Sequence, residues 1–344
     1  MLVLGIESTC DETACSIVKN GRNILSNVIS SQIDLHQEYG GVVPELACRR
    51  HIDVIIPVID EALKQAKVTL NDIDLIAVAR GPGLIGALLI GINAAKSLSL
   101  AIQKPLIGVN HIEAHLYASL MSHDAEIKFP ALGVVLSGGH TSLIHMHDIG
   151  SYSLIGQTID DAVGEAFDKV AKIMGLPYPG GPQIEKLALD GDPHFYPFAH
   201  GKVKNKPFDF SFSGLKTSVL YTIKGQSAQQ DSPLIIPEEH KKHVAASFQR
   251  TAFSDIIKKT LMAAQQYNCN SVIFGGGVTN NQTLRRMFSQ EGTHHTFYWP
   301  SAGLSLDNAA MIAGLGYHTY LKSGKSDSLH LEALTRINLE NPRI

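Results

Sequence analysis

Two histidines four residues apart form the most distinctive chemical pattern in the chain. His111 and His115 lie in the segment HIEAH, and on a helix this spacing places both imidazoles on one face. Imidazole is a common ligand of first-row divalent metals, so the pair predicts part of a metal site. With 16 histidines in 344 residues, a chance pair on the surface is the alternative interpretation.

A third ligand must come from elsewhere in the chain, and Asp307 is a candidate. It stands in the segment SLDNAAMIA at the start of a predicted helix, where it could equally cap that helix together with Asn308. One carboxylate oxygen and two imidazoles make a mixed site that suits iron or zinc. We therefore expect one divalent metal per chain, Fe²⁺ or alternatively Zn²⁺.

The position of Glu113 excludes one class of metal enzyme. In zinc peptidases with the pattern H-E-x-x-H, the glutamate directly follows the first histidine and acts as the general base. Here it comes one residue later. At about 100° per residue, Glu113 lies roughly 160° round the helix from the histidines and cannot take that role.

Three turns have the composition of phosphate or sugar sites. They are STCDET after the first predicted strand, SGGHT in the second half, and GGGVTNN before a helix. Glycines let backbone N–H groups approach an anion, and a helix N-terminus adds a favourable dipole. None matches the Walker or dinucleotide-binding glycine patterns. Tight turns need glycine in any case, so the three turns indicate a phosphate site only together, by converging on one cleft.

A charged stripe follows the second of these turns. The segment DDAVGEAFDKVAKIMG predicts a helix over residues 160–175, with four charged residues on one face: Asp161, Glu165, Asp168 and Lys172. A solvated face is the usual explanation. The small residues beside the stripe would nevertheless let a ligand approach, so Asp168 could hold a ribose.

The order of predicted elements repeats in the two halves of the chain. Three strands joined by tight turns open the chain at residues 2–30, and three more open the second half after residue 130. Each unit leads through helix and strand to a glycine turn and another helix. The repeat predicts a duplicated α/β fold with a cleft between two lobes, which we place at 1–125 and 126–344. We expect an insertion near 190–216, and the last helix could pack back on the first lobe.

Composition limits the compartment and the partners. The four cysteines, Cys10, Cys15, Cys48 and Cys269, form no C-x-x-C pair, which favours free thiols in the cytoplasm. The longest apolar run, LIGALLIGI, falls short of the ~20 residues that span a bilayer, so no membrane association is expected. The net charge is −3, so a nucleic acid must meet a local basic cluster.

Three basic clusters could meet a nucleic acid. Lys202, Lys204 and Lys206 are our choice, because they lie in a long irregular segment beside four aromatic residues, Phe195, Tyr196, Phe198 and Phe208. Such side chains can neutralise phosphates and stack on unpaired bases. The pairs at 49–50 and 285–286 are the alternatives, and a lysine-rich loop can also serve solubility alone.

Together the motifs resemble one family over essentially the whole chain. GIESTCDET, GGVVPELA, HIEAH, LSGGHT, IDDAVGEAFDKVAK, YPGGP, FSFSGLKT, GGGVTNNQTLR and LDNAAMIA follow one another as in the bacterial tRNA threonylcarbamoyltransferase (TsaD-like) family. Members once carried the name glycoprotease, which the displaced glutamate argues against. The resemblance implies the duplicated two-lobe fold of actin, sugar kinases and the Hsp70 ATPase (the ASKHA fold).

The resemblance also implies an activity and partners. The enzyme would transfer threonylcarbamoyl from threonylcarbamoyl-adenylate to N6 of adenosine 37 in tRNAs that read codons beginning with adenine, and release AMP. It would act with a paralogous partner of the same fold and a small ATPase. Two alternatives share the fold, an ATP-dependent small-molecule kinase and a nucleotide-regulated binding module, because fold alone does not fix function.

Site residues carry over from the family by position. The metal ligands would be His111, His115 and Asp307, and an acidic pair at the first turn, Asp11 and Glu12, is a weaker candidate for the catalytic base. Contacts to the adenylate would fall on Val135, Leu136, Ser137, Gly138, Gly139, Asp168, Gly181 and Asn281. Leu306 replaces a residue that is often polar, and Cys48 stands where serine is frequent, but neither departure removes a ligand.

Overall fold

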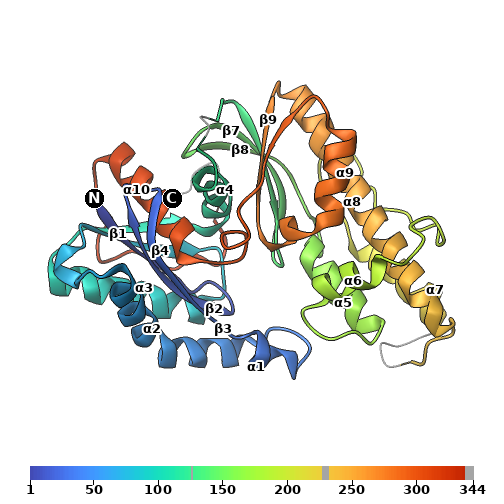
Figure 1. Cartoon of the computed structure of the whole chain (residues 1–344), viewed down its shortest axis with the longest axis horizontal. Coiled ribbons are helices and arrows are strands. Elements are labelled where there is room, and N and C mark those ends of the chain that lie inside the picture. The colour runs from blue at the N-terminus through green and yellow to red at the C-terminus, as the bar shows by residue number, and fades with distance from the viewer. Residues whose placement is uncertain (125–126, 227–231, 338–344) are drawn as a thin grey trace.

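The computed structural model describes residues 1–124, 127–226 and 232–337 as two lobes, each built on a five-stranded mixed sheet (Figure 1). The first sheet has the order β3-β2-β1-β4-β5. Its strands are β1 Leu2–Glu7, β2 Glu12–Lys19, β3 Asn23–Ser31, β4 Leu75–Gly81 and β5 Leu106–Asn110. The first three strands pair antiparallel, as the sequence predicts, and β4 and β5 add parallel to β1.

The second sheet repeats this topology, with the strand order β10-β9-β6-β7-β8. Its strands are β6 Ala131–Leu136, β7 Thr141–Asp148, β8 Ser151–Gln157, β9 Ser271–Gly275 and β10 Thr296–Tyr298. Again three antiparallel strands are extended by two parallel ones. The predicted duplicated α/β fold is therefore confirmed. The predicted boundary at residues 125 and 126 lies outside the described residues, and we keep it as a proposal.

Helices cover the sheets and fill the connections between them. In the first lobe they are α1 Ile33–Gln37, α2 Pro44–Ala66, η1 Leu70–Asp72, α3 Ile85–Ile102 and α4 His111–Met121. In the rest of the chain they are α5 Val163–Ile173, α6 Gly180–Ala188, α7 Ser213–Lys224, η2 Glu238–His240, α8 Lys241–Gln266, η3 Gly277–Asn280, α9 Gln282–Glu291 and α10 Ala309–Ser323. Helix α2 begins at Pro44, because proline suits the first turn, where the N–H has no helical partner.

The helix that follows each sheet packs against the opposite sheet. Helix α4 continues from β5 of the first sheet but packs against β9 and β6. Helix α10 comes at the end of the second half and packs against β1, β2 and β4 (Figure 1). The contact is close, because a Cβ on Gly5 of β1 would lie 2.4 Å from the carbonyl oxygen of Ala309. The two connections that carry α4 and α10 therefore cross between the lobes.

Helix α3 meets the length and hydropathy expected of a membrane span, and it is the one such helix in the described ranges. In this structure 28% of its residues are buried, and it packs against α2 and β4. The helix is longer than the apolar run LIGALLIGI, from which the sequence predicts no membrane association. Length and composition alone do not distinguish a core helix from a spanning one.

The charged stripe is only partly helical. The sequence predicts a helix over 160–175, but α5 begins at Val163. The reason is local, because Asp160 accepts hydrogen bonds from the Phe212 backbone N–H, at 2.8 Å, and from the Ser211 hydroxyl, at 2.6 Å. These bonds keep Asp160 and Asp161 in the turn before the helix. The prediction that Asp161 shares a helix face with Asp168 is therefore wrong.

Candidate functional site

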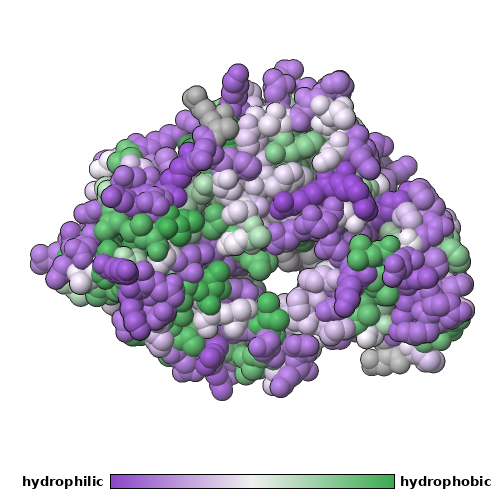
Figure 2. Space-filling view, viewed as in Figure 1, coloured by the Kyte–Doolittle hydropathy of each residue, from purple (hydrophilic) through white to green (hydrophobic). Residues whose placement is uncertain are grey.

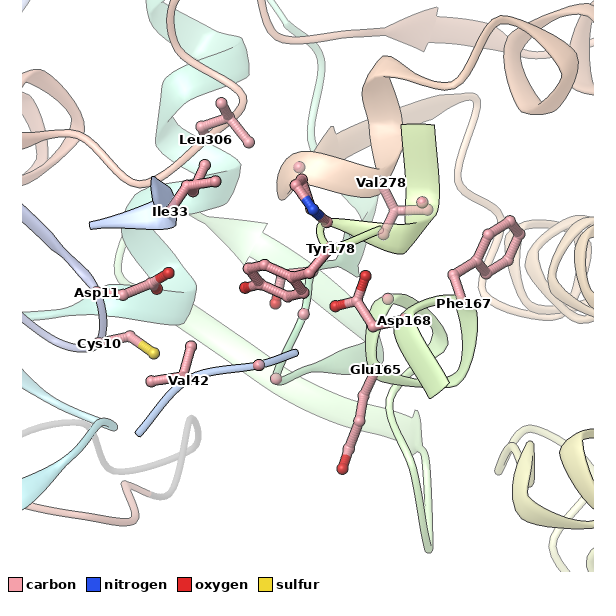
Figure 3. A pocket seen from close by; sticks show the side chains of 18 of the residues that line it. Cys10, Asp11, Ile33, Val42, Glu165, Phe167, Asp168, Tyr178, Val278 and Leu306 are labelled. Carbon is pink, nitrogen blue, oxygen red and sulfur yellow. The ribbon is translucent and has the colours of Figure 1, made fainter. Parts of the chain in front are cut away.

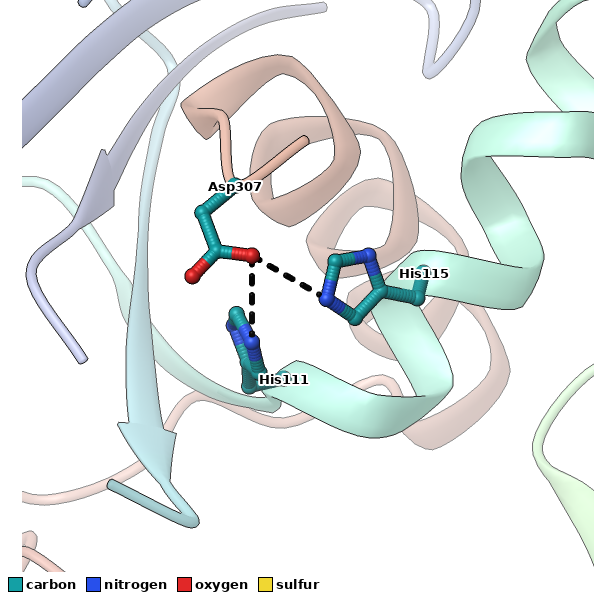
Figure 4. Close-up of side chains that lie close together, drawn as sticks. All are labelled: His111, His115 and Asp307. Atoms are coloured by element: carbon teal, nitrogen blue, oxygen red, sulfur yellow. Dashed lines mark ion pairs between the residues drawn. The ribbon is translucent and has the colours of Figure 1, made fainter. Parts of the chain in front are cut away.

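The predicted metal ligands meet where the two connections cross. Asn110 caps α4 through its side-chain oxygen, which accepts from the Ile112 N–H at 2.9 Å. The first turn of that helix then carries His111 and His115 on one face (Figure 4). Asn308 caps α10 in the same way, accepting from the Met311 N–H at 3.1 Å. Asn308 alone therefore takes the capping role, and Asp307 is left outside the helix.

The three side chains converge on one point. Asp307 Oδ1 lies 3.2 Å from His115 Nε2 and 3.6 Å from His111 Nε2 (Figure 4). One ligand atom from each of the three residues lies within 4.8 Å of the others. His115 is fully buried, yet neither of its ring nitrogens makes a hydrogen bond to a described residue. Its Nε2 has the Asp307 carboxylate nearby but no well-formed hydrogen bond, and a metal at the convergence point would satisfy that nitrogen. The residues therefore fit a metal site.

Glu7, at the end of β1, orients the first histidine and was missed by the sequence analysis. It is fully buried, and its Oε2 lies 2.9 Å from His111 Nδ1. Its Oε1 accepts the Thr9 N–H at 2.6 Å. A carboxylate on Nδ1 fixes the tautomer of the histidine and leaves Nε2 facing the ligand. The signal in the sequence was a glutamate ending an otherwise apolar strand, but its partner depends on the order of strands in the sheet.

The neighbouring carboxylates also change the pKa of His111 in the metal-free protein. Burial lowers the pKa of His111, but the neighbouring carboxylates of Glu7 and Asp307 outweigh it and raise the pKa to about 9. A proton on His111 therefore competes with a metal at neutral pH.

Glu113 lies away from this cluster, as the helical spacing predicts. Its side chain hydrogen-bonds to Tyr152 of β8 and contributes to raising the pKa of that phenol, after burial itself. It is 5% exposed and belongs to the packing of α4 against the second lobe. The arrangement of the zinc peptidases is absent from the described part of the chain.

A cleft of about 1240 Å³ lies between the lobes and includes His111 and Asp307 in its wall. Figure 2 shows it as the hollow at the centre of the molecular face. Several residues assigned by resemblance line it, namely Asp11, Glu12, Ser137, Gly138, Gly139, Asp168, Gly181 and Asn281. Figure 3 shows Tyr178 between Asp11 of the first lobe and Asp168 of the second. Tyr178 and His140 also line the cleft, and no pattern in the sequence indicated them.

The glycines around the cleft divide into two groups. A Cβ added to Gly138, Gly139 or Gly181 would meet nothing within 4 Å, so the backbone at these positions borders open space. A Cβ on Gly164 would lie 2.7 Å from the Ser137 carbonyl oxygen, and one on Gly276 would lie 2.4 Å from that of Leu136. The first group leaves room for a ligand, whereas the second lets elements of the fold pack closely.

Three residues assigned by resemblance have their side chains engaged in the fold. The side chains of Val135 and Leu136 are fully buried in the core on either face of β6 and do not reach the cleft. They position Ser137, the next residue. Asn281 caps α9, accepting from the Leu284 N–H at 3.0 Å, and its amide donates to Gln249 at 2.8 Å. A structural role therefore accounts for that side chain.

The acidic pair at the first turn is held by a buried histidine. Asp11 and Glu12 follow Cys10, whose carbonyl oxygen lies 2.9 Å from His51 Nε2. His51 Nδ1 lies 2.7 Å from the Thr13 hydroxyl, and burial lowers the pKa of His51, so the ring is neutral. Burial, followed by the charges of Asp11 and Asp307, raises the pKa of Glu12 well above the usual range of glutamate. Glu12 is therefore a poor proton acceptor at neutral pH.

Asp168 faces the cleft from α5 and also binds the backbone of α6. Its Oδ1 accepts the Gly180 N–H at 2.7 Å. Burial raises the pKa of Asp168 to about 6, although this bond and one from Gly181 oppose the shift. Beside it, Asp161 binds the ammonium groups of Lys169 and Lys216 at 2.5 and 2.7 Å. The wall of the cleft therefore carries both hydrogen-bond acceptors and cations.

Comparison with known proteins agrees with this geometry. Among solved structures, full-length HypF covers 94% of this chain and 56% of its own length, with a TM-score of 0.61 and 15% identity. Component A of the Acidaminococcus fermentans (R)-2-hydroxyglutaryl-CoA dehydratase covers 93% of this chain and 99% of its own, with a TM-score of 0.54 and 15% identity. At these identities the likeness concerns the fold alone.

Curated relatives are much closer in sequence. A tRNA N6-adenosine threonylcarbamoyltransferase of Protochlamydia amoebophila is 65% identical over 341 residues, which cover 99% of both chains. One of Chlamydia muridarum is 51% identical over 92% of both chains. The family described as TsaD, tRNA N6-adenosine threonylcarbamoyltransferase, matches residues 23–314. The chain therefore belongs to the tRNA N6-adenosine threonylcarbamoyltransferase family.

Proposed function

We propose that the interlobe cleft is the active site of this tRNA-modifying transferase and that its donor is threonylcarbamoyl-adenylate. The observation that carries the proposal is the meeting of three features in one cleft. These are the convergent ligands His111, His115 and Asp307, the open glycine turn at 137–139, and the acidic turn at 10–12. The reaction would move the threonylcarbamoyl group to N6 of adenosine 37 and release AMP.

The adenylate would lie against the second lobe. The backbone at Gly138 and Gly139 borders open space, so a phosphate can approach it closely. Gly181 would allow the same close approach next to Asp168, whose second carboxylate oxygen can accept from a ribose hydroxyl. Lys169 and Lys216 also line this wall, where Asp161 pairs with both, so they offer N–H donors and little net charge. The donor is already activated, so these groups need only hold it and stabilise AMP as the leaving group.

The metal would be held by His111, His115 and Asp307, with Glu7 behind the first histidine. Fe²⁺ and Zn²⁺ both suit two imidazoles and one carboxylate. A bound metal supplies positive charge that orients and polarises oxygens of the donor. The cluster borders the same cleft as the glycine turn, because His111 and Asp307 line it.

Proton transfer from the attacking amine favours Asp11 over Glu12. Burial, with the charges of Asp11 and Asp307, raises the pKa of Glu12, so this carboxyl gives up its proton less readily than a free glutamate. Asp11 lines the same part of the cleft, opposite Asp168 (Figure 3). We therefore assign the base to Asp11, and Glu12 would act as a hydrogen-bond donor in the same turn.

The remaining partners and the compartment follow from the family and the thiols. A paralogous protein of the same fold and a small ATPase would act with this chain. The four cysteines are free thiols, which supports a cytoplasmic location.

The proposal is tested in cells depleted of this protein. Nucleoside analysis of their tRNA should show loss of threonylcarbamoyladenosine, and the wild-type gene should restore it, whereas Asp11→Asn should not. A modification that survives depletion would refute the proposed reaction. Steady ATP turnover with a small-molecule acceptor would instead favour a kinase, and nucleotide binding without turnover or metal would favour a binding module.

A further inference from the structure

A second cavity, of about 250 Å³, lies in the C-terminal half between α8 and the irregular segment at 200–207. We call it the Lys202 pocket. Its polar lining comes from His200, Lys202, Lys206, Asp255, Lys258 and Lys259. Four of these six residues are lysines in a chain whose net charge is −3, so the positive charge is a local feature.

Two of the four lysines have no counter-charge among the described residues. Asp255 is 2% exposed and binds Lys259 Nζ at 2.7 Å. Lys206 lies 3.1 Å from Asp209. Lys202 and Lys258 are exposed and form no ion pair with the part of the chain that the structure describes. The pocket therefore presents surplus positive charge to solvent.

The pocket is built on a buried framework. Lys259 Nζ donates to the Asp209 carbonyl oxygen at 2.8 Å and lies 4.8 Å from the centre of the Phe210 ring. The Asp209 carboxylate accepts the Gln157 N–H at 3.0 Å, which ties the segment to β8. A carboxylate oxygen of buried Asp255 also remains without a hydrogen bond, 3.3 Å from His200 Nδ1. Lys202 and Lys206 therefore lie in a segment that is fixed at Asp209.

The same segment leads directly to the active-site cleft. Ser211 and Ser213 bind Asp160, and Lys216 lines the cleft. Lys216 follows Lys206 by ten positions in the chain, so the two residues lie at most roughly 35 Å apart. One RNA stem-loop can reach both.

The aromatic residues near the Lys202 pocket do not provide the base stacking that the sequence predicts. Phe198 and Phe208 are buried in the core, so they cannot stack on bases. Phe195 is 45% exposed, but its ring stacks on His243 at 4.5 Å. What remains is positive charge, which binds phosphates and carries no sequence information.

We propose that the Lys202 pocket binds phosphodiester groups of the tRNA backbone and positions the anticodon arm over the cleft. The proposal rests on the tRNA-modifying activity. Because the ammonium groups replace counterions on the phosphates, the pocket should contribute to the salt dependence of tRNA binding.

The test compares two double variants of the full chain. K202A/K258A removes both unpaired lysines from the pocket. K204A/K186A removes two exposed lysines, one in the same segment and one on α6, neither of which lines the pocket. The dissociation constant of tRNA is measured by filter binding from 50 to 200 mM salt, and AMP binding and thermal unfolding are measured for each protein.

K202A/K258A should lower the slope of log affinity against log salt by roughly 1.5, at about 0.7–0.9 per lost contact. AMP affinity and thermal unfolding should stay at wild-type values. An unchanged slope, an equal loss in K204A/K186A, or no measurable tRNA binding by the wild-type chain at 50 mM salt would each overturn the proposal. Failure of the proposed function would appear separately, as modification that survives depletion in cells.

Discussion

Replacing Glu7 with glutamine should weaken metal binding through the tautomer of His111. The two groups that face Glu7, the Thr9 N–H and His111 Nδ1–H, are both donors at 2.6 and 2.9 Å from its oxygens. Glutamine has only one acceptor oxygen. If that oxygen stays on Thr9, the amide N–H faces Nδ1 and forces the histidine proton onto Nε2, where the metal must bind.

The expected loss is large enough to measure. Partners behind a metal-ligating histidine typically contribute a factor of about 10–100 in metal affinity, or about 1.4–2.8 kcal/mol. Glu7 is fully buried, so water cannot replace the lost acceptor. We therefore expect the dissociation constant of Zn²⁺ to rise at least about tenfold in E7Q.

The pH of the measurement decides how clearly the effect appears. Glu7 helps to raise the pKa of His111 to about 9, so at pH 7 the proton lowers the apparent affinity of the wild type by about 100-fold. Glutamine relieves part of this competition and would mask the loss. At pH 9 the competition costs only about twofold, so the titration belongs there.

The assay is a titration with chelator-buffered Zn²⁺ at pH 9, accompanied by thermal unfolding. The matched control is E113Q, which neutralises another buried glutamate of the same region whose side chain faces Tyr152. That variant should bind metal like the wild type. A folded E7Q protein with affinity within twofold of the wild type would refute the tautomer argument.

Three further predictions concern the cleft and its metal. The H111A/H115A variant should purify without stoichiometric metal and lose transfer, and metal content near one per chain would contradict the ligand assignment. G138V should raise the dissociation constant of AMP at least about tenfold and leave the unfolding temperature unchanged. The control G164V should unfold at a lower temperature, because its Cβ would lie 2.7 Å from the Ser137 carbonyl oxygen. Unchanged AMP affinity in G138V would show that the turn has only a structural role. The pKa of Asp168, raised to about 6, means that its contribution to stability is fully present below pH ~4 and is lost as the pH rises through about 6. D168N should therefore flatten the stability profile of the ligand-free protein between pH 4 and 6 by up to about 3 kcal/mol while weakening AMP binding, and an unchanged profile in urea titrations would refute the shift.

The sequence predicted those features that local pattern determines. The strands 2–7, 12–19 and 23–31 follow from apolar runs between turns, and the left-handed φ values of Asn20 and Gly21 fit the tight turn between two of them. The histidine pair follows from helical spacing. Each of these predictions needs only neighbours within a few residues.

The failures share one physical cause, which is competition from distant residues. Asp160 and Asp161 have helical spacing, but hydrogen bonds to the start of α7 and ion pairs to Lys169 and Lys216 hold them outside α5. Phe198 and Phe208 look like exposed aromatics beside lysines, yet the irregular segment folds them into the core. Glu7 gains its role only because β1 lies in the same sheet as β5, which leads into His111.

The crossing of α4 and α10 explains why the metal ligands and the cleft form one site. His111 and His115 begin the helix that leaves the first sheet for the second, and Asp307 precedes the helix that returns. Helices α4 and α10 also pack directly against each other, so one helix–helix contact holds the ligands of the two connections together. The acidic turn at 10–12 and the glycine turn at 137–139 belong to opposite lobes and line the same cleft. The crossing of the two helices therefore places the candidate metal ligands beside a cleft to which both lobes contribute.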